Sequence, residues 1–249
     1  MGAPCVQLLF AVILWTTPYM GATTVFSASA SPLHQTKASF KTQSQFWNLT
    51  SGADMLHGRR KRAISSREIN ALLDYHNRVR SQVFPPAANM EYLVWDEGLA
   101  KSADSWASRC IWDHGPTQAM RHMGQNLSII SGRFHSVTEL VRSWNEERRH
   151  FSYPDSCGGA VCSHYTQMVW ASTSRMGCAI KTCSNMYVFG STWREATFLV
   201  CNYSIKGNWV GEAPYKVGRP CSACPSSYGG TCWRNQCSGS SGTKRRIGY

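Results

Sequence analysis

The stretch of sequence that says most about the fold is Ser163-His164-Tyr165-Thr166-Gln167-Met168-Val169-Trp170. It has a second half in Phe198-Leu199-Val200-Cys201-Asn202-Tyr203, which is followed by Gly207-Asn208-Trp209. Both halves are rich in β-branched and aromatic residues, a pattern that predicts strands with alternating faces. His164 would then stand at the start of the first strand, where its side chain can turn into a cleft. Either segment alone would be read as an ordinary core strand, and their pairing favours the cleft.

Helical patterns surround these runs. Two capping boxes and one N-cap mark the expected helix starts: Ser65 with Glu68, Ser136 with Glu139, and Asp96. The first helix has to stop before Pro85-Pro86, because proline cannot continue a helix. Strand-like runs are expected at Thr166 to Trp170, Cys178 to Lys181 and Thr197 to Tyr203. Interleaved helices and strands predict an α+β fold, arranged as a three-layer αβα sandwich.

The start of the chain carries export signals. An apolar core from Val6 to Trp15 is too short to span a bilayer and predicts a secretory signal peptide over 1–22. A Ser-, Thr- and Gln-rich segment follows and ends in the basic run Arg59, Arg60, Lys61 and Arg62. We read this run as a furin-type processing site, cleaved at paired basic residues, which makes 23–62 a propeptide. The alternative is a solvated basic linker. The protein is therefore expected to be secreted and extracellular.

The cysteines agree with export. Cys5 lies in the signal peptide, and ten cysteines follow it: Cys110, Cys157, Cys162, Cys178, Cys183, Cys201, Cys221, Cys224, Cys232 and Cys237. An even number in a secreted chain predicts full disulfide pairing and no free catalytic thiol. The dense C-terminal group would suggest a zinc ribbon in the cytosol. Outside the cell a disulfide knot is favoured, with Cys221–Cys232 and Cys224–Cys237 as the expected pairs.

Three Asn-x-Ser/Thr sequons mark the chain as a candidate glycoprotein. They begin at Asn48, Asn126 and Asn202. Sequons are frequent by chance, so the sequence leaves their occupancy open.

The two halves quoted first resemble the paired signatures of the CAP superfamily, which comprises cysteine-rich secretory proteins, antigen 5 and pathogenesis-related 1 proteins. The resemblance covers about Ile64 to Trp209 and implies the αβα sandwich. It divides the mature chain into a CAP (or SCP) domain over 63–210 and a cysteine-rich, hinge-like tail over 211–249. It also implies the disulfides Cys110–Cys178, Cys183–Cys201 and Cys157–Cys162.

Several local features narrow the resemblance to the subfamily of peptidase inhibitor 15. They are the basic run, His76-Asn77-x-x-Arg80, Phe84-Pro85-Pro86, Cys110-Ile111-Trp112, Gly124-Gln125-Asn126 and the short tail. This subfamily implies weak inhibition of trypsin-like serine proteases. A substrate-like inhibitor needs a rigid exposed loop that offers Lys or Arg to an acidic pocket. Lys181 and Arg219 are candidates, but Pro220 after Arg219 disfavours docking, so we assign no reactive site.

Superfamily members place two histidines and two glutamates in a central cavity. The matching positions here are His114, Gln125, Glu147 and His164, so one of the glutamates is replaced by glutamine. The change removes a negative charge and a potential metal ligand, and a paired-carboxylate acid/base mechanism loses a member. We expect no metal, with His114 and His164 as weak candidates. A hydrogen-bonded structural role for both is favoured over a catalytic one.

No other enzyme signature is present. The chain has no His-Glu-x-x-His zinc motif, no Gly-x-Ser-x-Gly elbow and no phosphate-binding glycine loop. We therefore expect a non-enzyme without a cofactor. An alternative is a sterol or lipid carrier, whose groove would lie among the Met and aromatic residues between Met168 and Phe189. Core packing is the favoured explanation for these side chains.

The charge balance suggests a third kind of partner. After residue 62 the chain has 20 Lys and Arg against 13 Asp and Glu, a net charge of +7. A basic surface favours acidic partners such as sulfated glycans of the matrix. Lys244-Arg245-Arg246 fits that idea, although a solvated basic end is the commoner explanation. The same charge argument would apply to nucleic acid, but nucleic acid lies in a different compartment from a secreted protein. We expect neither a nucleic-acid partner nor a membrane span.

Overall fold

Residues 64–132, 136–159 and 161–239 are described by the structure, a computed structural model. The expected signal peptide, propeptide, basic processing site and Asn48 lie outside the described residues. The helices are α1 Ser66–Ser81, α2 Glu97–Ala107, α3 Val137–Glu146 and α4 Ser163–Met168, with short 3-10 turns η1 Ala119–Arg121, η2 Glu147–Arg149 and η3 Ser226–Tyr228. The strands are β1 Val94–Trp95, β2 Gly124–Ser131, β3 Phe151–Ser152, β4 Ser156–Cys157, β5 Arg175–Val188, β6 Ser191–Ser204, β7 Cys232–Trp233 and β8 Gln236–Cys237.

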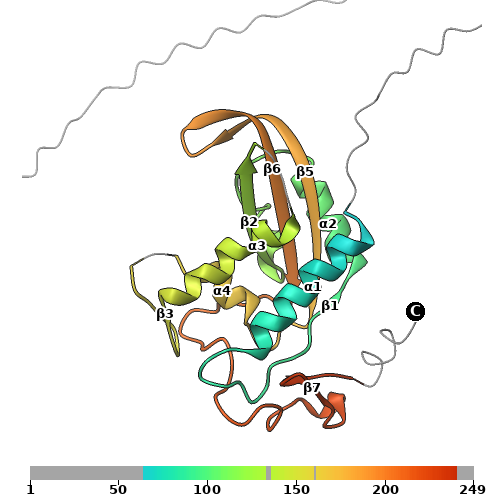
Figure 1. Cartoon of the computed structure of the whole chain (residues 1–249), viewed down its shortest axis with the longest axis vertical. Coiled ribbons are helices and arrows are strands. Elements are labelled where there is room, and N and C mark those ends of the chain that lie inside the picture. The colour runs from blue at the N-terminus through green and yellow to red at the C-terminus, as the bar shows by residue number, and fades with distance from the viewer. Residues whose placement is uncertain (1–63, 133–135, 160, 240–249) are drawn as a thin grey trace, which may run out of the picture. The chain divides into compact units, whose positions relative to one another are not determined.

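A four-stranded sheet with the order β1-β5-β6-β2 forms the middle layer. β5 and β6 make a long antiparallel hairpin, and β2 pairs antiparallel with the outer side of β6. β1 adds to β5 in parallel. Figure 1 shows α1, α3 and α4 gathered near the lower half of this sheet and the β5–β6 hairpin extending beyond them. The α+β, three-layer αβα prediction is confirmed.

Alternation along β6 divides the core between the two faces of the sheet. Leu199, Cys201 and Tyr203 belong to the cluster that includes α1, α3 and α4. Phe198 and Val200 belong to the cluster that includes α2. Successive side chains on a strand point to opposite faces, so the eight consecutive buried residues of β6, 196–203, supply both layers. This is why the strand reads as a continuous apolar run in the sequence.

The capping signals place two helices correctly. Ser65 caps α1, with both hydrogen bonds of the capping box to Glu68 present, and Asp96 Oδ1 accepts the Leu99 N–H at the start of α2. The third helix, α3, also begins after its expected cap, Ser136. The Ser136 hydroxyl, however, bonds to the Thr138 hydroxyl and makes no cap hydrogen bond.

The motif His76-Asn77-x-x-Arg80 fastens α1 to the loops below the sheet. Asn77 exchanges two hydrogen bonds with the Leu93 backbone. The Arg80 guanidinium is buried and donates to five carbonyls: those of Glu91, Met168, Trp170, Ala171 and Thr173. Burial lowers the pKa of Arg80 to about 10. An arginine here satisfies carbonyls that no strand or helix pairs.

His76 is buried within the same layer. Its Nδ1 lies 2.8 Å from the Leu72 carbonyl oxygen, and its Nε2 lies 2.9 Å from the Tyr203 hydroxyl. The carbonyl can only accept, so Nδ1 carries the hydrogen and Nε2 accepts from Tyr203. Burial lowers the pKa of His76 to about 4, and Arg80 contributes a smaller lowering. This histidine is a neutral structural group of the core.

Three disulfides match the expected pairs and two are different. Cys157–Cys162, Cys221–Cys232 and Cys224–Cys237 form as expected. The implied pairs Cys110–Cys178 and Cys183–Cys201 are wrong, because the structure joins Cys110 to Cys183 and Cys178 to Cys201. Cys178 and Cys201 lie directly opposite each other in the β5–β6 ladder, whereas Cys183 is opposite Ala196. Five residues of extended strand, about 17 Å, separate Cys183 from the level of Cys201.

The cysteine-rich tail packs against the rest of the fold through backbone hydrogen bonds. Cys237 donates its N–H to the Met90 carbonyl and accepts from the Tyr92 N–H, and it is fully buried. Gln236 donates to the Asn77 carbonyl, and the Tyr228 hydroxyl donates to Glu91 at 2.6 Å. Among the described residues, no helix has the length and apolar character needed to cross a bilayer.

Candidate functional site

The two halves of the deciding stretch meet in space, although the first is not a strand. The expected strand from Thr166 to Trp170 is wrong, since Ser163–Met168 forms helix α4. Gln167 Oε1 accepts the Gly207 N–H at 3.0 Å. A Cβ on Gly207 would lie 2.7 Å from Trp170 Cγ, so only glycine allows this approach. The hydrogen bond from Gly207 to Gln167, together with the close packing of Gly207 on Trp170, holds the loop after β6 against α4.

Glu147 is the anchor of helix α4. Its Oε2 accepts the N–H groups of His164 and Tyr165 at 3.0 and 3.1 Å, and its Oε1 lies 2.5 Å from His164 Nδ1. These are charge-assisted hydrogen bonds at the start of a helix, where N–H groups otherwise lack partners. The Trp144 ring stacks on the His164 ring at 6.3 Å between centroids. The His164 ring is therefore fixed by Glu147 at its Nδ1 edge and by Trp144 on one face.

His114 has a neutral partner in place of a carboxylate. Gln125 Oε1, on β2, lies 3.0 Å from His114 Nδ1 and also accepts the Gly115 N–H. The Gln125 amide in turn donates to Asn202 Oδ1 on β6 at 3.0 Å. A carboxylate at position 125 would offer no donor to Asn202. In the chain of hydrogen bonds from His114 to Asn202, the Gln125 amide accepts through its oxygen and donates through its nitrogen.

The four positions form two pairs with different environments. The His114–Gln125 pair bonds to β6, while the Glu147–His164 pair lies at the start of α4. Asn126 connects the two, because it follows Gln125 on β2 and donates to the His164 carbonyl at 3.0 Å. Each histidine is bonded at Nδ1, which leaves its Nε2 atom as the potential ligand.

The donor set does not fit a resident catalytic zinc ion. Such a site uses three protein ligands, and Glu147 already bonds His164 and two backbone N–H groups, which leaves two imidazoles. Within 64–132, 136–159 and 161–239, the one group of three or more candidate ligands with atoms within 4.8 Å is Cys221, Cys224 and Cys237. Their sulfur atoms are in disulfides.

Two of the expected glycosylation sites are contradicted. Asn126 is 2% exposed and Asn202 is fully buried. Their amides bond to the His164 carbonyl and, for Asn202, to the Leu99 carbonyl and Gln125. A glycan needs an exposed amide nitrogen, and both nitrogens point into the fold. These asparagines are structural members of the site.

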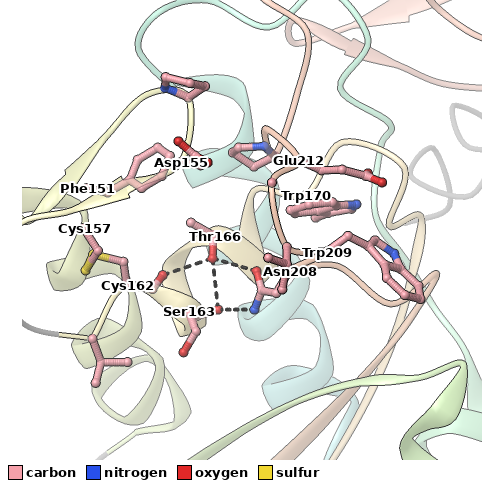
Figure 2. Close-up of a pocket in the computed structure, with 15 residues that line it drawn as sticks. Phe151, Asp155, Cys157, Cys162, Ser163, Thr166, Trp170, Asn208, Trp209 and Glu212 are labelled. Carbon is pink, nitrogen blue, oxygen red and sulfur yellow. Dashed lines mark hydrogen bonds between the residues drawn. A yellow bond between two sulfur atoms is a disulfide. The ribbon is translucent and has the colours of Figure 1, made fainter.

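An open pocket of about 490 Å³ lies beside α4, next to this site. Figure 2 shows Thr166 at its centre, where its hydroxyl and the Asn208 side chain form hydrogen bonds with each other and with the carbonyls of Cys162 and Ser163 at the start of α4. The walls carry aromatic rings and two carboxylates: Phe151, Trp170, Trp209, Asp155 and Glu212. None of the four cavity positions lines this pocket.

The candidate reactive residues do not form an inhibitory loop. Lys181 is 8% exposed within β5, and its ammonium pairs with Asp104 at 2.5 Å, so it cannot enter a protease. Arg219 is exposed, but Pro220 follows it. The residues suggested for a lipid groove are mainly core, as favoured: Met168, Met176 and Met186 are buried, while Tyr187 and Phe189 are exposed.

Comparison with known proteins identifies a matching family and similar relatives. A profile described as CAP, Cysteine-rich secretory protein family, matches residues 73–203. A curated relative named Peptidase inhibitor R3HDML, from Mus musculus, is 63% identical over 201 residues, 77% of this chain and 79% of its own length. Peptidase inhibitor 15 from Homo sapiens is 59% identical over 195 residues, 74% of this chain and 76% of its own.

A solved structure shares the fold at lower identity. It is described as the crystal structure of NaASP2 with Zn2+, and it is 26% identical with a TM-score of 0.57. The likeness covers 70% of this chain and 96% of that one.

Sequence reasoning missed the supporting residues of the site. The sequence marks Asn202 only as a candidate sequon. Its hydrogen bond with Gln125 depends on the pairing of β6 with β2, and β2 is a strand that the sequence does not predict. Asp155 and Glu212 come from separate loops, and no motif marks them. Trp144 did carry a signal, because it follows the helical spacing of α3 and precedes Glu147 by three residues.

Proposed function

This chain belongs to the cysteine-rich secretory protein (CAP) family, and we propose that it is a secreted, non-enzymatic inhibitor of a trypsin-like serine peptidase. The observation that carries the proposal is its 63% and 59% identity to two proteins named as peptidase inhibitors, over about three quarters of each chain. The site supports the non-enzymatic part, because one glutamate is engaged in bonding α4 and the other is replaced by Gln125.

Two exposed loop cations, Lys216 and Arg234, suggest the mode of inhibition. A substrate-like inhibitor offers Lys or Arg from an extended segment whose backbone pairs with the protease. Lys216 is exposed, but its N–H and carbonyl already bond to Asn89 and Ala88. Arg234, at the tip of the β7–β8 hairpin, has a φ of 48°, which is left-handed and not extended. We therefore propose that the peptidase is bound outside its specificity pocket.

The proposal includes the organisation of the precursor. A signal peptide over 1–22 and a propeptide over 23–62 precede the CAP domain over 63–210 and the tail over 211–249. The hydrogen bonds of Cys237 and Gln236 to the domain support a tail that stays attached to it. Removal of the propeptide would leave Ala63 as the first residue.

A titration of trypsin with the secreted protein tests the inhibitor function. Trypsin activity on a small chromogenic substrate and on casein is followed while the protein is added, and the chain is then checked on a gel. We expect saturable inhibition of casein cleavage, with the chain intact at saturation. Absence of inhibition with both substrates, or inhibition that disappears as the chain is digested, would overturn the proposal. The triple variant K216A/R219A/R234A is expected to inhibit within twofold of the wild type.

A further inference from the structure

A second pocket, of about 510 Å³, lies where α1, the end of α3 with η2, and α4 come together. Three arginines line it: Arg78 from α1, and Arg148 and Arg149 from η2. No aspartate or glutamate contributes to its lining. We call this the basic pocket. Its charge differs from that of the pocket in Figure 2, whose charged lining residues are the acids Asp155 and Glu212.

The arginine charges are largely uncompensated. Arg149 Nη2 lies 4.0 Å from Glu146 Oε1. The Arg149 side chain is 71% exposed and the Glu146 side chain 50%, so this ion pair is weak. Among the described residues, neither Arg78 nor Arg148 has a carboxylate within ion-pair distance. Glu147 is next to Arg148 in the sequence, but its carboxylate bonds to His164 and Tyr165. Within the described residues, the guanidinium groups of Arg78 and Arg148 therefore have no carboxylate partner, and that of Arg149 has a weak one, so the three groups can bind an anion.

Aromatic rings form much of the remaining lining of the basic pocket. Tyr75 lies on α1, Phe151 on β3, and Phe84 is 88% exposed at the rim. An exposed phenylalanine next to three arginines is costly to hydrate and is suited to contact with the face of a ring. Phe151 also lines the pocket of Figure 2, so the two pockets share one wall.

The chemistry of the ligand follows from these features. Arginine binds oxyanions with two parallel hydrogen bonds, and three arginines on two elements match several anionic groups better than a single one. The exposed rim at Phe84 would leave a long alkyl chain in contact with water. A saccharide ring that carries sulfates suits both features, because its apolar face can lie on the rings while its sulfates reach the arginines.

We propose that the basic pocket binds a sulfated saccharide segment, with sulfates on Arg78, Arg148 and Arg149 and a sugar ring on Phe84 and Phe151. The pocket volume is in the usual range for small-molecule sites, about 300 to 1,000 Å³. The proposal does not rest on peptidase inhibition, and it would attach the protein to sulfated glycans through the basic pocket.

Binding of a size-defined heparin octasaccharide tests the proposal by calorimetry on the secreted protein at 50 and 150 mM NaCl. We expect R78A/R148A to lower the affinity at least tenfold. The matched control R67A/R142A removes the same charge from exposed arginines of α1 and α3 outside the pocket and should change the affinity less than threefold. F84A should lower the affinity severalfold and leave its salt dependence unchanged. Thermal unfolding verifies that all variants are folded, which is expected because the altered side chains are exposed.

Four outcomes would overturn the proposal. Equal losses in the two double variants would indicate diffuse attraction to the basic surface. Lack of binding at 50 mM NaCl, or equally tight binding of a fully desulfated octasaccharide, would exclude a sulfate site. A fluorescent fatty acid that binds independently of salt, displaces the octasaccharide and is lost in R78A/R148A would assign the pocket to a lipid.

Discussion

The two histidines of the site each form a hydrogen bond through Nδ1, one to a charged oxygen and the other to a neutral one. His164 Nδ1 bonds to the carboxylate of Glu147, and His114 Nδ1 bonds to the amide of Gln125. The carboxylate also accepts the N–H groups of His164 and Tyr165 in the first turn of α4, whereas the Gln125 amide donates a hydrogen bond to Asn202. The first pair therefore stabilises a helix start and the second joins a loop to the sheet. Neither leaves a carboxylate free for proton transfer.

The largest effect is expected from removing the carboxylate of the first pair. Glu147→Ala leaves two N–H groups of α4 and His164 Nδ1 without their acceptor, which should lower the free energy of unfolding by about 2 to 3 kcal/mol. Urea denaturation checks this value. Glu146→Ala is the matched control, because Glu146 is exposed and its ion pair with Arg149 is long, at 4.0 Å. This substitution should change the free energy of unfolding by about 0.5 kcal/mol or less. Equal effects of the two variants would contradict the role of Glu147.

A third histidine gives the reference for a fully structural role. The pKa of His76 is lowered to about 4 in the folded chain, while its ordinary value is 6.5. Between these values the unfolded state binds more protons, so stability is complete above pH 6.5 and falls as the pH drops towards 4. We expect a loss on the order of 2 kcal/mol from His76 between pH 7.5 and pH 5. In His76→Gln, which is less stable at both pH values, the pH-dependent loss should shrink by that amount, and an unchanged loss would contradict the assignment.

The two histidines of the pairs should differ on truncation. His164→Ala removes a partner of Glu147 and the ring that stacks on Trp144, and we expect a loss of about 1 to 2 kcal/mol in the free energy of unfolding. His114 is exposed, so His114→Ala should cost about 0.5 kcal/mol or less. Thermal unfolding of both variants gives the comparison. A larger loss in His114→Ala would reverse the account of the two pairs.

The smallest effect is expected from giving the second pair a charge. Gln125→Glu keeps the acceptor for His114 and Gly115 but places an oxygen against Asn202 Oδ1, where an N–H now donates. A loss of about 1 kcal/mol at pH 8 is expected in urea denaturation. Gln118→Glu, an exposed substitution nearby in sequence, should be close to neutral. A stabilised Gln125→Glu variant would show that the amide is not required by Asn202.

The sequence predicted the elements whose signals lie within a few residues of one another. The Ser65–Glu68 capping box and the Asp96 cap located α1 and α2, and the continuous apolar run located β6, one of the two inner strands of the sheet. The sequence does not predict helix α4, because its helical period is obscured and the residue that caps it, Glu147, is distant in the sequence. Tyr165, Met168 and Val169 are buried with helical spacing, but the neighbouring Gln167 and Trp170 are buried too and hide the period. Its first N–H groups are satisfied by Glu147, 17 residues away from His164.

The candidate site could be predicted only as a set of positions. The family resemblance identified His114, Gln125, Glu147 and His164, but not their division into two pairs. That division depends on the pairing of Gln125 with Asn202 in the β2–β6 ladder. The two wrong disulfides have the same origin, since the opposition of Cys178 and Cys201 is a matter of strand register. Register is set by packing between distant segments, which spacing in the sequence does not contain.

The central claim is that the chain binds a trypsin-like peptidase outside the specificity pocket, and competition with benzamidine tests it most directly. Binding of the secreted protein to trypsin with its catalytic serine replaced by alanine is measured with and without saturating benzamidine, which fills that pocket. The account predicts a saturable complex whose Kd changes less than twofold when benzamidine is present. A complex that benzamidine abolishes would mean that a Lys or Arg enters the pocket, and the absence of any complex would remove the inhibitor function itself.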